Sequence, residues 1–388
     1  MQSSFDVVVV GLGAMGSAAA YHLARQGARV LGIEARGVAH DQGSSHGESR
    51  IIRQAYFEHP AYVPMVLRAY QLWRELEGES ETSLLTVTGG LAIGTPHSSL
   101  VTGCLASARL HSLTHELLDA SAMKQRFPQF ALGDNEVAVY ESQAGFLRPE
   151  ECIRQHLRCA AQRGADLHFD EPIVSWSASE TAAGSGEGVQ VVTTKQTYRA
   201  RSLVITAGPW SSEILPGLAV PLTVVRRVMF WFRPTAQPSA FDAGIFPIFL
   251  WEPRQGPFFY GLPRVDATGD PKAAIHWAAD TDGNTCTPST IDRNIHPRDE
   301  SAIRSVLAAR IPALNGHITH AATCMYTMTP DAHFVIDTHP AHPQVAIAAG
   351  FSGHGFKFSS AVGEILADLA LKGRVSSDLT LFSASRVQ

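Results

Sequence analysis

The sequence has few cysteines and none of the spacings that bind metals. Its five cysteines are odd in number and widely separated, and no C-x-x-C pair occurs. This pattern argues against a zinc site and against a disulfide framework, and it is typical of reduced thiols inside the cell. We therefore expect no metal and a cytoplasmic protein.

Long apolar runs are also absent. No segment reaches the roughly 18 uninterrupted apolar residues that a membrane helix requires. The first apolar stretch, residues 7–10, follows an acidic residue and runs directly into glycines. This pattern predicts a buried strand and not a signal peptide. We expect no contact with a membrane.

Positive charge is not in excess. The formal net charge is -5 and the pI is about 6.4, so the chain has no basic field to attract nucleic acid. With 388 residues the chain is long enough for two domains, because a single core rarely grows beyond roughly 250–300 residues. We therefore expect a globular protein that does not bind nucleic acid.

A glycine motif opens the chain. The pattern Gly11-x-Gly13-x-x-Gly16 lies between an apolar strand and a predicted helix at 14–26, and a second strand ends at Glu34. Such glycines allow a tight turn, close approach of the backbone to a pyrophosphate and close helix packing, while the acidic residue accepts hydrogen bonds from a ribose. The sequence therefore predicts a dinucleotide site.

The remaining pattern predicts an α/β fold in two domains. Helices are expected at 61–78, 149–163 and 357–371, strands near 84–94, 166–176 and 202–206, and mostly strands over 221–330. Because both ends of the chain look nucleotide-binding and the middle does not, we expect a discontinuous Rossmann-like nucleotide-binding domain with an inserted β-rich substrate domain. The predicted ranges are 1–85, 145–220 and 325–388 for the first domain, and 86–144 and 221–324 for the second.

The glycine motif alone does not distinguish FAD from NAD. Two further features favour FAD. Strand-to-glycine turns recur at 202–210 and 345–357, whereas an NAD domain is usually continuous. The second of these turns also brings backbone amides to a helix start, where they could offset the negative charge of a reduced flavin.

One pair of residues and two single residues are ambiguous when their chemistry is considered alone. Arg50 and Arg53 are three residues apart, and we expect them on one face of a helical turn, where they could bind a carboxylate or form a solvated basic turn. Cys324, taken alone, is typical of a small buried core residue. Lys357, taken alone, is typical of a solvated lysine at a helix start.

Several segments together resemble one family, the monomeric sarcosine oxidase and N-methyltryptophan oxidase group of FAD-dependent amine oxidases. The similarity runs from end to end of the chain, and it implies a Rossmann-like FAD-binding domain similar to those of glutathione reductase and D-amino-acid oxidase. The matching segments are G-L-G-A-M-G at 11–16, G-S-S-H-G-E-S-R-I-I-R at 43–53, Y-V-P-M-V-L-R-A at 62–69, A-G-P-W at 207–210, C-M-Y-T at 324–327, P-D-A-H-F-V-I-D at 330–337 and F-S-G-H-G-F-K-F-S-S at 351–360.

The resemblance implies roles for individual residues. It implies a flavin linked through its 8α-methyl carbon to Cys324, and a substrate carboxylate held between Arg53 and Lys357. It implies catalytic roles for Lys272 (oxygen activation), Arg50, His276 and Tyr326, and substrate contacts from Tyr260 and Leu250. The implied FAD contacts are Gly11, Gly13, Ala14, Met15, Gly16, Glu34, Ser44, His46, Ser49, Arg50, Ile173, Ala207, Gly208, Trp210, Cys324, Met325, Gly353, His354, Gly355, Phe356 and Lys357.

The predicted activity is oxidation of a secondary, N-methyl α-amino acid to an imine, with O2 reduced to H2O2 by a monomeric enzyme. Ser45, Ser49, Leu250 and the segment Q-A-Y-F-E-H-P at 54–60 depart from the family pattern, so the exact amine stays open. L-pipecolate and fructosyl amino acids are alternative substrates. Two alternatives belong to other functional classes: an NAD-dependent dehydrogenase and a non-catalytic flavin-binding protein.

Overall fold

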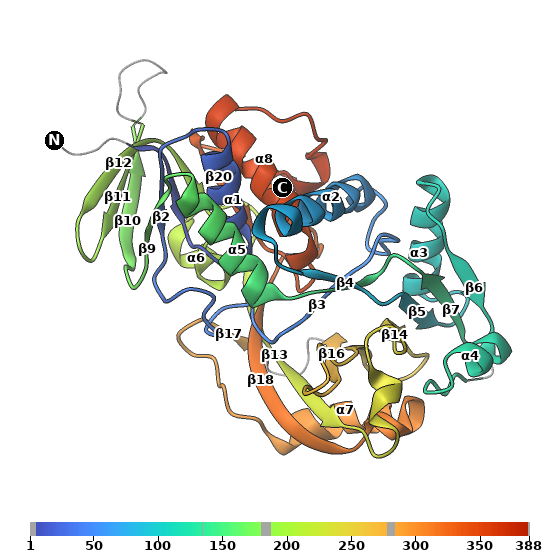
Figure 1. Ribbon diagram of the computed structural model, residues 1–388. Coiled ribbons are helices and arrows are strands. Elements are labelled where there is room, and N and C mark those ends of the chain that lie inside the picture. The colour runs from blue at the N-terminus through green and yellow to red at the C-terminus, as the bar shows by residue number, and fades with distance from the viewer. Residues whose placement is uncertain (1–4, 134, 180–187, 278–283, 387–388) are drawn as a thin grey trace.

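Two large β-sheets and one small sheet carry the fold (Figure 1). The structure is a computed structural model that describes residues 5–133, 135–179, 188–277 and 284–386. Within these ranges the sheets contain eight, nine and three strands. The expected α/β architecture is confirmed.

The first sheet is built around a buried parallel strand, β1 (Phe5–Val10). It pairs in parallel with β2 (Val30–Ile33) on one side and β12 (Thr197–Ile205) on the other. Further strands are β9 (Asp166–His168), β10 (Ile173–Ala178), β11 (Val189–Thr193), β19 (Val335–His339) and β20 (His342–Ala349). The valines of β1 are buried, as expected for a strand covered on both faces.

Helices from both ends of the chain pack together beside this sheet. Helix α1 (Ala14–Arg25) contacts α5 (Pro149–Gln162) and α8 (Ser359–Lys372), and α2 (Tyr62–Ser80) contacts both of these. In Figure 1 the blue first helix lies next to the red last one. At Gly363 of α8 a Cβ atom would come within 2.5 Å of Ala18, so the two helices approach closely.

The second sheet contains the longest strand pair. Strands β13 (Thr223–Arg233) and β18 (His317–Met328) pair antiparallel along their length. The other strands are β5 (Gly90–Gly94), β6 (Glu116–Leu118), β7 (Val137–Glu141), β14 (Ile248–Glu252), β15 (Phe258–Leu262), β16 (Lys272–Trp277) and β17 (Thr285–Cys286). Buried aromatic rings from these strands, including Phe232, Phe249 and Trp251, form a separate core. Helices α3 (Ser99–Leu110) and α4 (Ala120–Arg126) lie beside it (Figure 1).

The small sheet corrects one prediction. Strand β3 (Arg50–Ile52) pairs with β8 (Gly145–Leu147), which also pairs with β4 (Leu85–Val87). The expected helical turn that would carry Arg50 and Arg53 on one face is therefore wrong. Backbone pairing with β8 holds this segment extended, and the two side chains do not share a helical face.

The region 221–330, expected to be mostly β, also contains helix α7 (Pro297–Arg310). Pro297 begins it, and His296 and Asp299 form a capping box that satisfies the first amides. The predicted strand at 166–176 is split into β9 and β10, and the last helix begins at Ser359 after a short turn.

A buried ion pair fixes α7 to the second sheet. Arg226 on β13 donates to both carboxylate oxygens of Asp299, at 3.0 and 2.8 Å, and also to the carbonyls of Asp292 and Asn294. The side chains of Arg226 and Asp299 are 6% and 11% exposed. Because both side chains are buried, either one would carry an uncompensated charge if the other were removed.

Arg226→Met should therefore lower the free energy of unfolding by about 3–5 kcal/mol. Replacing Asp299 by Leu in the same protein should recover part of that loss. Urea unfolding followed by circular dichroism measures both. The neighbouring Arg298→Met, on the exposed face of α7, serves as the control and should change stability by less than about 0.5 kcal/mol. Equal losses in both single variants would contradict this account.

Candidate functional site

The glycine turn between β1 and α1 leaves one face of the backbone open. Gly11 has φ +84°, and a Cβ atom on Gly16 would lie 1.7 Å from the Gly11 carbonyl oxygen. At Gly13, the N-cap of α1, nothing lies within 4 Å of a Cβ position, and no side chain caps the helix. The first amides of α1 are therefore available to an anionic group such as a pyrophosphate.

Glu34 follows β2 and is directed back to this turn. Its carboxylate accepts the Leu12 N–H at 2.8 Å and the Arg36 N–H at 3.1 Å, and His40 lies 3.5 Å away. The side chain is mostly buried, so its position is fixed. These contacts hold a carboxylate beside the turn, where it can accept hydrogen bonds from the hydroxyls of an adenosine ribose.

A single cavity of about 570 Å³ begins at this turn and extends to the second sheet. It is lined by residues from both ends of the chain. The predicted site residues that line it are Gly11, Gly13, Ala14, Met15, Glu34, Ser44, Arg50, Arg53, Ile173, Ala207, Gly208, Trp210, Leu250, Tyr260, His276, Cys324, Met325, Tyr326, Gly353, His354, Gly355, Phe356 and Lys357.

Four predicted site residues do not line the cavity. Gly16 lies beneath the turn, in contact with Gly11. Ser49 accepts hydrogen bonds through its backbone carbonyl from Arg50 and Lys272. His46 is buried, and its Nε2 has no hydrogen-bond partner among the described residues. Lys272 lies one layer behind the wall.

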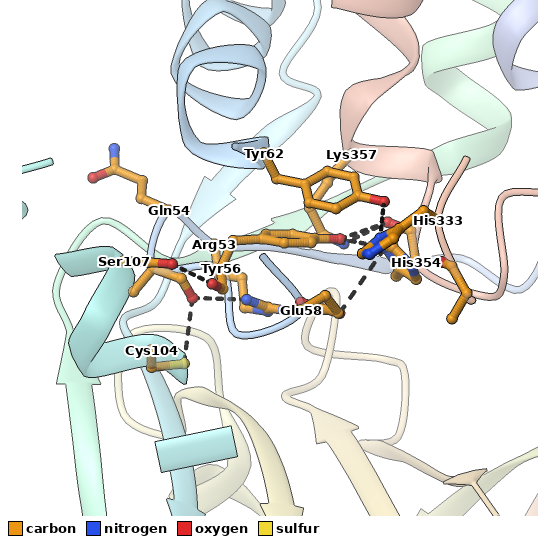
Figure 2. Close-up of polar contacts among 12 residues, drawn as sticks. Arg53, Gln54, Tyr56, Glu58, Tyr62, Cys104, Ser107, His333, His354 and Lys357 are labelled. Atoms are coloured by element: carbon orange, nitrogen blue, oxygen red, sulfur yellow. Dashed lines mark hydrogen bonds and ion pairs between the residues drawn. The ribbon is translucent and has the colours of Figure 1, made fainter. Parts of the chain in front are cut away.

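Arg53 and Lys357 both line the cavity, and both lie against the ring of Tyr56 (Figure 2). Arg53 follows β3 and is 4% exposed; Lys357 lies in the turn before α8 and is 5% exposed. The Arg53 guanidinium lies over the Tyr56 ring, 4.2 Å from its centre. Lys357 donates to the His354 carbonyl at 2.7 Å and to the Tyr56 hydroxyl at 3.4 Å. Two buried cations from opposite ends of the chain thus face one space.

A buried carboxylate that the sequence prediction missed neutralises part of this charge. Glu58 accepts two hydrogen bonds from Arg53, at 2.7 and 2.9 Å. Burial opposes its charge, but Arg53, His354 and Lys357 hold the pKa of Glu58 at about 2. Glu58 lies in the segment 54–60 that departs from the family pattern. A carboxylate five residues after an arginine that was expected to bind a carboxylate was the available signal.

The same environment weakens the charge of Lys357. Burial and the nearby Arg53 lower its pKa to about 7, while Glu58 opposes this effect. The ammonium group is therefore present below pH 7 and lost above it. Lys357 can gain a proton when a second carboxylate enters the cavity.

His354 supports this end of the site in a defined tautomer. Its Nε2 lies 3.0 Å from the Ala332 carbonyl, which can only accept, so we assign the proton to Nε2. Its Nδ1 then accepts from the Tyr56 hydroxyl at 2.5 Å. Burial lowers the pKa of His354 to about 4, which keeps the ring neutral.

The second sheet contributes an aromatic cluster and the predicted anchor to the cavity lining. The Tyr260 and His276 rings lie 5.9 Å apart at 90°, and Tyr326 lies 5.9 Å from His276. Cys324 on β18 is 2% exposed and lines the cavity. Burial raises the pKa of its thiol, and the cationic Arg50 works against this increase.

Lys272, at the start of β16, is 1% exposed. Its ammonium donates to the carbonyls of Gly47 and Ser49, both at 2.6 Å. Burial and Arg50 lower its pKa well below the ordinary value, and Glu150 and Glu48 oppose that decrease.

Metal-binding clusters and membrane-spanning helices are both absent from the described residues. Within the described ranges, no cluster of three or more His, Cys, Asp or Glu side chains could hold a metal ion. None of the helices over the same ranges combines the length and apolar character needed to cross a bilayer.

Comparisons with known proteins agree with this geometry. A family model described as FAD dependent oxidoreductase matches residues 6–369. Monomeric sarcosine oxidase from Streptomyces avermitilis is 46% identical, covering 100% of this chain and 99% of its own. N-methyl-L-tryptophan oxidase from Yersinia pestis is 34% identical over 98% of this chain and 99% of its own. Among solved structures, NikD, an unusual amino acid oxidase essential for nikkomycin biosynthesis, superimposes with a TM-score of 0.84 at 23% identity, covering 98% of both chains.

The glycine turn generates a direct prediction. Gly16→Ala places a methyl group against the Gly11 carbonyl, so the turn must shift and the purified protein should lose most of its bound dinucleotide. The absorbance ratio of cofactor to protein measures this loss. Gly37→Ala is the matched control, because nothing lies within 4 Å of its Cβ position. Full cofactor content in the Gly16 variant would contradict the assignment of the turn.

Proposed function

We propose that this chain, which belongs to the FAD dependent oxidoreductase family, is an oxidase of small N-methyl α-amino acids such as sarcosine. One observation carries the proposal. The cavity that begins at an open dinucleotide turn ends at two buried cations, Arg53 and Lys357, which suit a carboxylate.

The residues present fit FAD. Gly13 leaves space where a pyrophosphate would approach the first amides of α1, and Glu34 offers an acceptor for the adenosine ribose. The turn at Gly353 and Gly355 brings further backbone to the other part of the cavity. FAD, when bound, supplies the redox chemistry: it accepts two electrons from a substrate C–N group and passes them to O2, which yields H2O2.

The chain's own residues would bind and orient the substrate. Arg53 and Lys357 would hold its carboxylate, while Tyr260, His276 and Tyr326 would surround its amine end and exclude water. Glu58 now pairs with Arg53 at 2.7 Å, so an incoming carboxylate must compete with it. This competition favours substrates whose carboxylate can reach both cations at once.

Three finer features belong to the same proposal. Cys324, a buried residue that lines the cavity near Arg50, would hold the flavin covalently: its thiol would lose a proton, a C–S bond would replace a C–H bond at the 8α carbon, and O2 would accept the two electrons released. Lys272 would stabilise the negative charge that develops on O2, since a fixed cation has a large effect in a site without water. The similarity to monomeric sarcosine oxidase supports a monomer.

A peroxide assay tests the proposal. The purified yellow protein is supplied with N-methylglycine, N-methyltryptophan, L-pipecolate and a fructosyl amino acid, and H2O2 release is measured. We expect turnover with N-methylated amino acids and none with N-methylated amines that lack a carboxylate. Equal rates with and without the carboxylate would overturn the proposal, and turnover of only pipecolate or the fructosyl compound would redirect it.

The covalent link has its own test. Cys324→Ala should release its flavin into the supernatant when the protein is precipitated with acid, whereas the unmodified protein should keep the yellow colour in the pellet. Cys286→Ala, a change at a cysteine that does not line the cavity, is the control. Colour retained in the Cys324→Ala pellet would exclude this cysteine as the anchor.

The lowered pKa of Lys357 predicts a pH dependence of carboxylate binding. Since this pKa is about 7, the ammonium group is present below pH 7, and the affinity for acetate should fall as the pH rises through 7. The decrease can reach about tenfold per pH unit. Lys357→Arg should keep its charge and remove the dependence, and Lys357→Met should bind weakly at all pH values. Calorimetric titration measures each affinity, and a flat profile from pH 6 to 8.5 in the unmodified protein would refute the prediction.

A further inference from the structure

The turn at Gly47 and Glu48 has an unusual backbone shape. Both residues have positive φ values, +97° and +66°. Glu48 must hold a conformation that a residue with a side chain seldom adopts. At Gly47 a Cβ atom would lie 2.8 Å from Met229, which lines the cavity. Contacts with other parts of the chain must hold this turn.

Two charged side chains bind the turn from opposite sides. Glu150 accepts the Gly47 N–H at 2.6 Å and the Glu48 N–H at 3.2 Å with one carboxylate oxygen. Lys272 donates to the Gly47 carbonyl at 2.6 Å. The Glu48 N–H and the Gly47 carbonyl are the two ends of one peptide group, so a carboxylate binds one end and an ammonium group binds the other.

Such an arrangement couples the two charges. A carboxylate at the N–H end of a peptide polarises it and makes its carbonyl a better acceptor for a cation. Resting on the proposed role of Lys272, we infer that Glu150 is a positioning residue for the oxygen reaction: it is the counter-ion of Lys272, acts through the peptide between Gly47 and Glu48, and keeps the ammonium group charged and in place.

The other carboxylate that acts on the charge of Lys272 is Glu48, which is exposed to solvent that screens its charge. Arg50 from β3 is a second cation, and burial of the ammonium also disfavours its charge. Trp231 from β13 places its ring centre 5.3 Å away, and the Cys324 thiol from β18 is the remaining neighbour. Glu48 is exposed, and its carboxylate accepts from the Trp231 N–H at 2.8 Å.

Glu150, in contrast, is held by its two hydrogen bonds to the turn. It lies in the first turn of α5, where the unpaired amides of a helix favour negative charge. It also borders a surface hollow whose charged residues carry both signs. These are Glu48, Glu81, Arg148, Glu151 and Arg154. The carboxylate therefore contacts solvent on one side and the turn on the other.

Glu150→Gln separates charge from geometry, because a glutamine oxygen can still accept both N–H groups. The holoenzyme is reduced with dithionite and mixed with O2, so the test does not depend on the substrate. We expect reoxidation at pH 8 to slow at least tenfold, and the pH above which reoxidation is lost to fall by at least one unit. The sign follows from the lost negative charge, which makes Lys272 release its proton at lower pH.

Glu151→Gln is the matched control, because Glu151 is adjacent but bonds to Gln155 and Arg154 on the helix surface. It should reoxidise at the unmodified rate. Lys272→Met tests the underlying role of the lysine: unchanged reoxidation there would overturn that role. Slowed reoxidation in Lys272→Met with an unchanged rate and pH profile in Glu150→Gln would overturn only the counter-ion inference.

Thermal melting gives a readout that does not depend on turnover. Glu150→Gln should lower the melting temperature of the holoenzyme, but it should have little further effect when Lys272 is already Met, because the partner charge is gone. Additive shifts in the double variant would show two independent contacts and overturn the inference.

Discussion

The cost of burying positive charge constrains the structure around the cavity. Four cationic side chains, Arg50, Arg53, Lys272 and Lys357, lie in or directly behind the wall of one cavity in a protein whose net charge is -5. None of them can be buried without compensation. Each is therefore held by carbonyl oxygens, by a carboxylate or by both, and these partners determine the shape of the segments between 44 and 60 and between 350 and 358.

The two sheets collect these groups from distant parts of the chain. The first sheet supplies an open glycine turn and a buried acid, as dinucleotide sites require. The second sheet supplies Lys272, His276 and Cys324 from strands β16 and β18. The small sheet lies between them and carries Arg50. No single segment contains enough of the site to act alone. The order of the strands in the sheets therefore determines where the cavity forms.

Much of this arrangement could be predicted from the sequence. The glycine turn, Glu34, Cys324 and Lys357 lie along one cavity because their motifs are local and their neighbours along the chain fix their backbone. The roles of these residues and the domain limits stay predictions. The contacts that escaped prediction are non-local or depend on sheet pairing. The importance of Glu58 depends on its ion pair with Arg53, and the extended form of β3 depends on its pairing with β8. Helix α7 depends on its cap and on the ion pair of Asp299 with Arg226.

The close packing of α8 on α1 has a consequence for how the protein is made. Gly363 rests against Ala18, and β20, which leads into the last turn and helix, adds to the same sheet as β1. The first helix therefore has no partner on that side while the chain is still being synthesised. Synthesis must therefore pass α8 before the first helix gains this partner, and must pass Lys357 before that side chain can line the cavity. A product that stops before β20 would lack this part of the cavity wall.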